Sequence, residues 1–336
     1  MKPIFLPVLI FILSLTACMH QGVKPDWVDG KGSEYPASRY LVGRGEHIDQ
    51  ARARDYARAD LAKIFQVAID EQSIDITKYS SKKIGRDTIE QLESEASRDI
   101  SARTEQVISG VDIADIWYDS ENKAYHVLAA LDRIQMTRNL RQEINQQDEV
   151  TQQHLTAARQ TSSLITQIGA ASRAIETQIA RDSNQRLMKI VDRSGVGVPE
   201  KYNFGKLIND RATLLKRLKI KPKASRDDLG GLKRTLAGAL ASVGFSHKGG
   251  ADADYELDAQ VALQPIEDKE GWFWIRGSID INLKDTKTGE SQGSHRWNIK
   301  VSAQNHASAK KRAKSEVDKL LKKELKAVII GFGQPD

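Results

Sequence analysis

The sequence predicts an α+β fold, with two small α+β domains joined by a long helical segment that could form a coiled coil. Short stretches of alternating apolar residues, typical of strands, occur in both halves of the chain beside longer stretches with apolar residues at helical spacing. Between the halves, Gln, Ala, Ser, Thr and Arg dominate a stretch with only a narrow apolar stripe. A length of 336 residues also accommodates about two domains.

The first 17 residues have the features of a lipoprotein signal peptide. One cation, Lys2, precedes an apolar core at residues 4–15, which is too short to span a membrane comfortably. The core is closed by Leu15, Thr16, Ala17 and Cys18. This Leu-small-small-Cys order is the lipobox of bacterial lipoproteins, because the modifying transferase needs a thiol and the signal peptidase needs small residues before its cut. The mature chain is therefore expected to begin at Cys18, with acyl chains such as palmitate on that residue.

Cysteine usage and hydropathy support a lipid anchor. The chain has one cysteine, so an internal disulfide is excluded, and acylation removes a thiol that would be a liability in an oxidising compartment. No later stretch reaches about 18 apolar residues, so the mature chain should be anchored to a membrane rather than span it. Residue 19 is Met and not Asp, which by the enterobacterial sorting pattern favours the outer membrane, facing the periplasm.

The first domain is expected at residues 38–131, after an acylated tether at residues 18–37 with few apolar residues. Residues 39–45 predict a strand that ends in a glycine turn. An Ala-rich helix should follow, with Ala53, Ala57, Leu61 and Ile64 at helical spacing. The alternation of apolar residues over 65–69 then predicts another strand.

A second helix and a strand hairpin complete this domain. The helix should begin near Asp87, where Glu90 three residues later forms a capping pair. Strands are predicted around residues 111–118 and 124–131, joined by the polar turn at 119–122. The resulting element order, β-α-β-α-β-β, describes a compact α+β domain.

Residues 132–192 form the helical segment between the domains. Apolar residues recur there at alternating steps of three and four, namely Leu155, Ala158, Ile165, Ile168, Ile175 and Ile179. One alternative is a straight spacer or coiled-coil stalk, in which about 60 residues would span roughly 90 Å. The other alternative is a helical hairpin, broken near Gly169, that packs on itself.

The second domain is expected at residues 198–331, after a break at 195–199 that contains Gly and Pro. The predicted helices cover 202–218, 229–243 and 307–329, and the predicted strands cover 255–263, 272–283 and 294–301. A hairpin turn at 285–289 should join the last two strands, because Gly289 can adopt a positive φ.

Motifs that carry catalysis or hold a cofactor are not found in the sequence. The seven His residues are scattered without the spacing of a zinc site, and neither a Walker motif nor a Gly-x-Ser-x-Gly motif occurs. Gly43 and Gly45 could let a backbone approach a phosphate, but Ile48 stands where a third glycine is needed. A strand-to-helix turn explains the pair better. The chain is therefore predicted not to be an enzyme, with no catalytic residue, metal or cofactor.

Two features could form a partner surface. Residues 272–274 are an aromatic cluster on a strand, where alternation places the two tryptophans on one face. Such a strand is more often buried on both faces than exposed for a partner. The last helix carries a basic face, which is either simply solvated or in contact with anionic lipid or wall polymer. The candidate residues are Trp272, Trp274, Lys310, Lys311 and Arg312.

The net charge of +6 points to anionic partners. An exported basic protein can meet lipid headgroups, acidic wall polymers or nucleic acid. Export makes nucleic acid the least suitable of the three, so no nucleic acid is expected. The membrane, envelope proteins and peptidoglycan are left as candidate partners.

The first half resembles a known lipoprotein family. The likeness is carried by Pro25, Asp26, Trp27 and Val28, by the strand at 40–45 with its two glycines, by the Ala-rich helix at 51–62, and by Ile64 and Phe65. Together they resemble the Lpp-twenty lipoprotein family over residues 25–140. The resemblance implies a small α+β module without known enzymatic activity, in a family of outer-membrane lipoproteins of which some serve flagellar assembly or motility.

The second half has a likeness at the level of the fold. An Ala-Asp-Tyr strand at 253–257 precedes a strand that runs through 281–290 and ends in an Asp-x-x-Thr-Gly-Glu turn. This pattern is similar to the fold shared by the TolB amino-terminal domain and lipoprotein activators of penicillin-binding proteins.

These observations predict a non-catalytic lipoprotein of the cell envelope with a structural or protein-interaction role in outer-membrane, cell-wall or flagellar assembly. The alternative is a regulator of a peptidoglycan-synthesising enzyme that reaches inward from the outer membrane, which a rod of roughly 90 Å would favour. A wall hydrolase is the third hypothesis, and the missing catalytic motifs argue against it.

Overall fold

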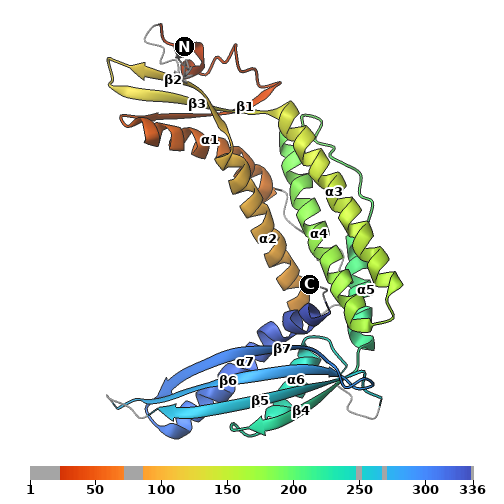
Figure 1. Ribbon diagram of the computed structural model, residues 1–336. Coiled ribbons are helices and arrows are strands. Elements are labelled where there is room, and N and C mark those ends of the chain that lie inside the picture. The colour runs from red at the N-terminus through yellow and green to blue at the C-terminus, as the bar shows by residue number, and fades with distance from the viewer. Residues whose placement is uncertain (1–22, 72–85, 247–251, 267–270, 334–336) are drawn as a thin grey trace, which may run out of the picture. The chain divides into compact units, whose positions relative to one another are not determined.

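The computed structural model describes residues 23–71, 86–246, 252–266 and 271–333 (Figure 1). The chain divides into two compact units, each assembled from segments that lie far apart in the sequence. Unit 1 comprises Met1–Ser73, Ser101–Leu140 and Arg186–Gly197, and unit 2 comprises Ile74–Ile100, Arg141–Gln185 and Val198–Asp336. Both units mix helices with a sheet, so the predicted α+β fold class is confirmed.

A three-stranded antiparallel sheet forms the centre of unit 1. Its strands are β1 (Tyr40–His47), β2 (Asp112–Asp119) and β3 (Ala124–Asp132), in the order β1-β3-β2. The hairpin between β2 and β3 is confirmed. Its turn forms because the Asp119 carboxylate accepts hydrogen bonds from the backbone N–H groups of Glu121 and Asn122, at 2.9 and 3.1 Å.

Helix α1 (Gln50–Glu71) covers one face of this sheet at very short range. Gly43 and Gly45 of β1 make the approach possible, because a Cβ at either position would collide with the backbone of α1. The predicted glycine turn is therefore wrong, because both glycines lie inside β1 and serve helix–strand packing.

The strand predicted at residues 65–69 is wrong, because these residues continue α1. Phe65 extends the buried stripe of Ala53, Ala57 and Leu61 by one more step of four residues. Val67, which the alternation placed with Phe65, is 59% exposed. Five residues are too few to distinguish the two periods from the sequence.

Trp27 covers the other face of the sheet. It lies in a 3-10 helix (Asp26–Asp29) and packs against Trp117 and Leu128. Its indole N–H donates to Asp115 Oδ2 at 2.7 Å, so the buried ring has its polar atom satisfied. Part of the expected tether, residues 26–29, is therefore folded onto the domain.

Three long helices follow the predicted helical regions of the first half and the centre. Helix α2 (Arg86–Ser109) begins next to the predicted start at Asp87. Helices α3 (Arg133–Gln160) and α4 (Leu164–Val191) are separated by residues 161–163 and lie side by side (Figure 1). Within the described segments, no helix is both long enough and apolar enough to cross a membrane.

The segment at 132–192 is the helical hairpin and not the rod. Its contacts are antiparallel, since Glu143 reaches Asn184 and Asp148 reaches Arg181. The break also differs from the expected one, because Gly169 lies inside α4. The expectation of a straight span of roughly 90 Å is therefore wrong.

A four-stranded sheet forms the centre of the second domain, within unit 2. Its strands are β4 (Ile220–Asp227), β5 (Tyr255–Ile266), β6 (Phe273–Asp285) and β7 (Ser291–Ala303), in that order. The last three strands and the turn before β7 are confirmed, with Gly289 at φ +75°. Strand β4 was not predicted. It pairs in parallel with β5 at the sheet edge, where Ile220 and Pro222 are buried and Lys221 and Lys223 are exposed.

Helices α6 (Leu232–Ser242) and α7 (His306–Phe332) cover one face of this sheet, and α5 (Phe204–Arg217) precedes it in the chain. All three confirm predicted helices. In Figure 1 α6 and α7 both pass behind the strands. Every second residue of β5 and β6 is buried against them, including Leu257, Val261, Ile279 and Leu283. The opposite face of the sheet is polar.

Candidate interaction surface

The predicted partner residues meet at one end of the four-stranded sheet. Strand β6 begins there, with Phe273 opposite Ala303 and Trp274 opposite Ser302 at the end of β7. The guanidinium of Arg312, in the second turn of α7, donates to the backbone carbonyl of Ser302 at 2.6 Å. Residues nearly forty positions apart in the sequence thus lie together, because β7 leads directly into α7.

The aromatic residues at this end are more exposed than expected. Trp272 and Phe273 are 42% and 44% exposed, so the prediction that the strand is buried on both faces is wrong for this part. Burial begins only at Ile275, which packs with Ala303 and Ala309. The first buried residue of α7 is Ala309, which packs next to Ile275. The helix therefore does not cover Trp272 and Phe273, which precede Ile275.

Trp274 lies on the polar face of the sheet, as its alternation with Ile275 requires. The ammonium of Lys300 sits over its ring, 4.9 Å from the centroid, which is a cation–π contact. Lys310 and Lys311 are exposed in the first turns of α7. The surface therefore combines exposed aromatic carbon with cations from two elements.

A groove of about 660 Å³ runs along the polar face of the sheet. Its lining includes Asp258, Gln260, Asp280, Asn282, Lys284 and Arg296. Much of this polarity is already paired within the sheet. Arg296 forms an ion pair with Asp280, and Lys223 binds Glu256 at 3.0 Å, which holds the pKa of the Glu256 carboxyl below its usual value. The groove offers hydrogen bonds but no activated nucleophile.

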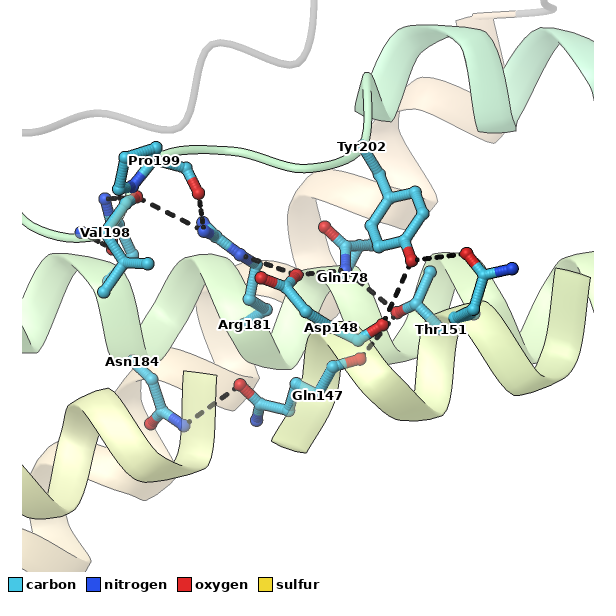
Figure 2. Close-up of polar contacts among 11 residues, drawn as sticks. Gln147, Asp148, Thr151, Gln178, Arg181, Asn184, Val198, Pro199 and Tyr202 are labelled. Atoms are coloured by element: carbon cyan, nitrogen blue, oxygen red, sulfur yellow. Dashed lines mark hydrogen bonds and ion pairs between the residues drawn. The ribbon is translucent and has the colours of Figure 1, made fainter. Parts of the chain in front are cut away.

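A buried polar network connects α3, α4 and the segment before α5 within unit 2 (Figure 2). At its centre, Arg181 Nε donates to Asp148 Oδ1 at 3.1 Å, with both side chains at most 3% exposed. Gln178 donates to the same carboxylate oxygen at 3.3 Å and to the Thr151 hydroxyl at 2.9 Å. Asp148 Oδ2 has no hydrogen-bond partner among the described residues.

The other end of Arg181 holds the chain after the hairpin. Its Nη2 donates to the carbonyls of Val198 and Pro199, at 3.3 and 2.8 Å. Gln185 exchanges two further hydrogen bonds with the backbone of Val198. Burial and the nearby Asp148 carboxylate raise the pKa of Tyr202, whose hydroxyl donates to the Asp148 backbone carbonyl at 3.2 Å. Apart from Asp148 Oδ2, the polar groups of the network bond to one another and to the backbone, which is the chemistry of a structural lock.

A second buried group of charges joins α2, α4, α5 and α7 within unit 2. Arg211 is buried, and this desolvation lowers the pKa of its guanidinium, against the opposing charges of Glu95 and Glu176. Burial also raises the pKa of Glu176 and lowers the pKa of Lys326 to about 8. Sequence reasoning missed both networks, because the periodicity of these helices signals only their apolar residues.

The remaining side chains of interest are the possible metal ligands and the predicted lipidation residues. Across the described residues, no group of three or more His, Cys, Asp or Glu residues is placed to hold a metal ion. His47 accepts a hydrogen bond from the Asp49 backbone N–H at 2.8 Å, and His126 lies 3.8 Å from Glu46. The predicted lipidation residues, Leu15 to Cys18, lie outside the described residues.

Comparison with known proteins shows a similarity in the first half of the chain. Residues 25–132 match the LPP20 lipoprotein family, which confirms the predicted resemblance. Similarity of this segment to a lipoprotein family indicates a lipid-anchored protein of the cell envelope. None of the curated proteins matches the chain.

Several solved structures are similar to parts of this chain. The secreted protein HP1454 of Helicobacter pylori has 12% identity, covers 85% of this chain and 98% of its own, and has a TM-score of 0.41. A candidate lipoprotein from Caulobacter crescentus has 20% identity and a TM-score of 0.27, and the match covers 35% of this chain and 93% of that protein. A minor lipoprotein from Acinetobacter baumannii has 13% identity and a TM-score of 0.26, and the match covers 34% of this chain and 92% of that protein. No function is carried over from these structures.

Proposed function

We propose that this protein is a non-catalytic lipoprotein of the outer membrane, anchored through acylated Cys18, which holds its second domain against another component of the envelope. The proposal rests on where the family match lies relative to the predicted lipobox. The match to the lipoprotein family begins at residue 25, a few residues after the predicted lipobox that ends at Cys18. Two or three acyl chains on that residue give stable anchoring, whereas one chain would be marginal.

The described helices include no candidate membrane span, and the lipid is the proposed means of membrane attachment. Met19, which replaces the Asp of inner-membrane retention, supports the outer membrane as the destination.

The interaction role is supported by the end of the four-stranded sheet. Trp272 and Phe273 expose large aromatic surfaces beside cations of α7. Exposed aromatic residues next to Arg and Lys are typical of binding surfaces. The alternative of a regulator that reaches a wall enzyme relied on a straight rod, and the hairpin of α3 and α4 removes that support.

Labelling with radioactive palmitate tests the anchor. The wild-type chain should incorporate the label and float with outer-membrane vesicles in a density gradient. The Cys18→Ala chain should lose both properties and accumulate unprocessed or soluble. Persistent labelling of the Cys18→Ala chain, or wild-type protein in the soluble fraction, would refute the proposal.

Crosslinking in intact cells tests the interaction role. A photoreactive residue at position 273 should give a specific adduct, whereas the same residue at the polar, exposed position Gln264 serves as the matched control on the same sheet. Equal adducts from both positions would show that the exposed aromatic pair has no special role.

A further inference from the structure

We propose that the helical face of the second domain docks on a bilayer surface rich in anionic phospholipid. The docking face consists of the outward sides of α6 and α7 together with Phe273. This inference rests on the proposed function, because it names the envelope component that the second domain contacts.

The first argument is the distribution of charge. Helices α6 and α7 together contain ten Lys and Arg residues and only three acidic residues. Their excess of seven positive charges is larger than the net charge of +6 of the whole chain. Helix α6 contains no acidic residue at all. Such a single-sign field attracts a polyanionic surface.

The second argument is helical geometry. The buried stripe of α7 repeats every four residues, at Ala309, Ala313, Val317, Leu321, Leu325 and Ile329. A position two residues further along lies about 200° around the helix and so faces directly away from the sheet. Lys311, Lys319 and Lys323 occupy this opposite stripe. With the described residues they make no hydrogen bond or ion pair, so their charges are available.

The third argument is that α6 adds cations to the same layer. Lys314 donates to the carbonyl of Gly230 at 2.8 Å, which ties α7 to the start of α6. Lys233 and Arg234 in the first turn of α6 are exposed. Among the acidic residues of α7, Asp318 pairs with Lys322 at 2.7 Å, and Glu324 accepts from the Trp297 indole at 2.6 Å. The remaining charge of the layer is therefore strongly positive.

The fourth argument distinguishes a bilayer from a soluble polyanion. Phe273 alternates with Ile275 and Ile279, so it lies on the side of the sheet that α6 and α7 cover. Because α7 does not extend over it, Phe273 remains 44% exposed, and the neighbouring Trp272 is 42% exposed. Aromatic side chains at the edge of a basic surface fit the boundary between headgroups and acyl chains. A hydrated wall polymer would use the cations but would gain little from Phe273.

Binding to vesicles tests the inference. The mature chain with Cys18→Ser, which carries no lipid, is mixed with vesicles of phosphatidylcholine alone or with phosphatidylglycerol added, and bound protein is measured by flotation. Binding should require phosphatidylglycerol and should weaken as salt is raised. Each cation near an anionic surface strengthens binding by about fivefold. The triple variant Lys311→Gln, Lys319→Gln, Lys323→Gln should therefore bind roughly a hundredfold more weakly.

Matched variants separate a defined face from general charge. Arg276→Gln, Lys284→Gln and Lys287→Gln together remove the same charge from exposed positions on the polar face of the sheet and its turn, and should leave binding nearly unchanged. Phe273→Ser should weaken binding several-fold, whereas Val196→Ser, another exposed apolar residue, should not. Circular dichroism verifies that all variants are folded.

Three results would overturn the inference. The first is no binding, or equal binding to both kinds of vesicle. The second is an equal loss from the two triple variants. The third is loss from the lysine variant while Phe273→Ser binds normally, which would show that charge alone drives binding and that the aromatic residue does not enter the bilayer. Because the assay uses a chain without an anchor, its failure leaves the palmitate result and the proposed function untouched.

Discussion

The buried pair of Asp148 and Arg181 gives the sharpest prediction about stability. The variant Asp148→Leu leaves the guanidinium of Arg181, which is 3% exposed, without its carboxylate. Two hydrogen bonds to the carbonyls of Val198 and Pro199 remain, but they do not neutralise the charge. Breaking a buried pair from one side costs about 3–5 kcal/mol, and we expect a loss of this size in the free energy of unfolding.

The double variant tests whether the two charges act as a pair. Asp148→Leu combined with Arg181→Met replaces the pair by apolar side chains of similar volume, which is often neutral for buried pairs. We expect the double variant to lie within about 2 kcal/mol of the wild type, far less than the sum of the single losses. Part of the remaining loss comes from the Val198 and Pro199 carbonyls, which would lose a donor.

Urea denaturation of the mature Cys18→Ser chain, followed by circular dichroism, measures all four corners of this cycle. The same substitutions at an exposed ion pair, Lys322→Met and Asp318→Leu, provide the control and should each change stability by less than about 1 kcal/mol. The prediction would be refuted if each single variant lost less than about 1 kcal/mol of unfolding free energy, or if the two losses simply added in the double variant. Either result would show that Asp148 and Arg181 are not energetically coupled as a buried ion pair.

Two further predictions concern packing and titration. Gly45→Ala should destabilise unit 1 by about 3 kcal/mol or more, because the new Cβ would overlap the α1 backbone, whereas Gly238→Ala has open space and should be neutral or slightly stabilising in thermal unfolding. Lys326 has its pKa lowered to about 8 by burial and by the neighbouring Arg211, so its charged form opposes folding at neutral pH. Lys326→Met should therefore be more stable than the wild type by about 3 kcal/mol near pH 7, and this advantage should shrink between pH 8 and the unfolded value of 10.5. A pH-independent difference would contradict the second prediction, and equal effects of the two alanine substitutions would contradict the first.

Local patterns in the sequence were sufficient for much of the fold. The turn around Gly289 and the hairpin turn after Asp119 depend on residues within a few positions of each other, and both occur as predicted. The helix predicted at 307–329 closely matches α7, because its helical pattern extends over many turns. The family resemblance over the first domain was also carried by short, contiguous motifs, and residues 25–132 match that family.

Tertiary contacts decided what local patterns left open or misrepresented. Residues 65–69 satisfy the periods of both a strand and a helix, and packing of Phe65 behind Leu61 selected the helix. The linker folds back on itself, and the hairpin brings Asp148 and Arg181, more than thirty residues apart, into a buried ion pair that a straight rod could not form. Strand β4, a short stretch that contains a proline, was revealed only by its pairing with β5 at the sheet edge.

The candidate surface shows the same division. The aromatic cluster and the basic helix were each visible in the sequence, but their proximity was not. Exposure of Trp272 and Phe273 depends on where α7 first meets the sheet, at Ala309. Whether a side chain is buried depends on the residues that pack against it. At the start of β6 these residues belong to α7, which lies more than thirty positions later in the sequence. The sequence therefore determined which side chains were available, and only the tertiary structure decided which of them face solvent together.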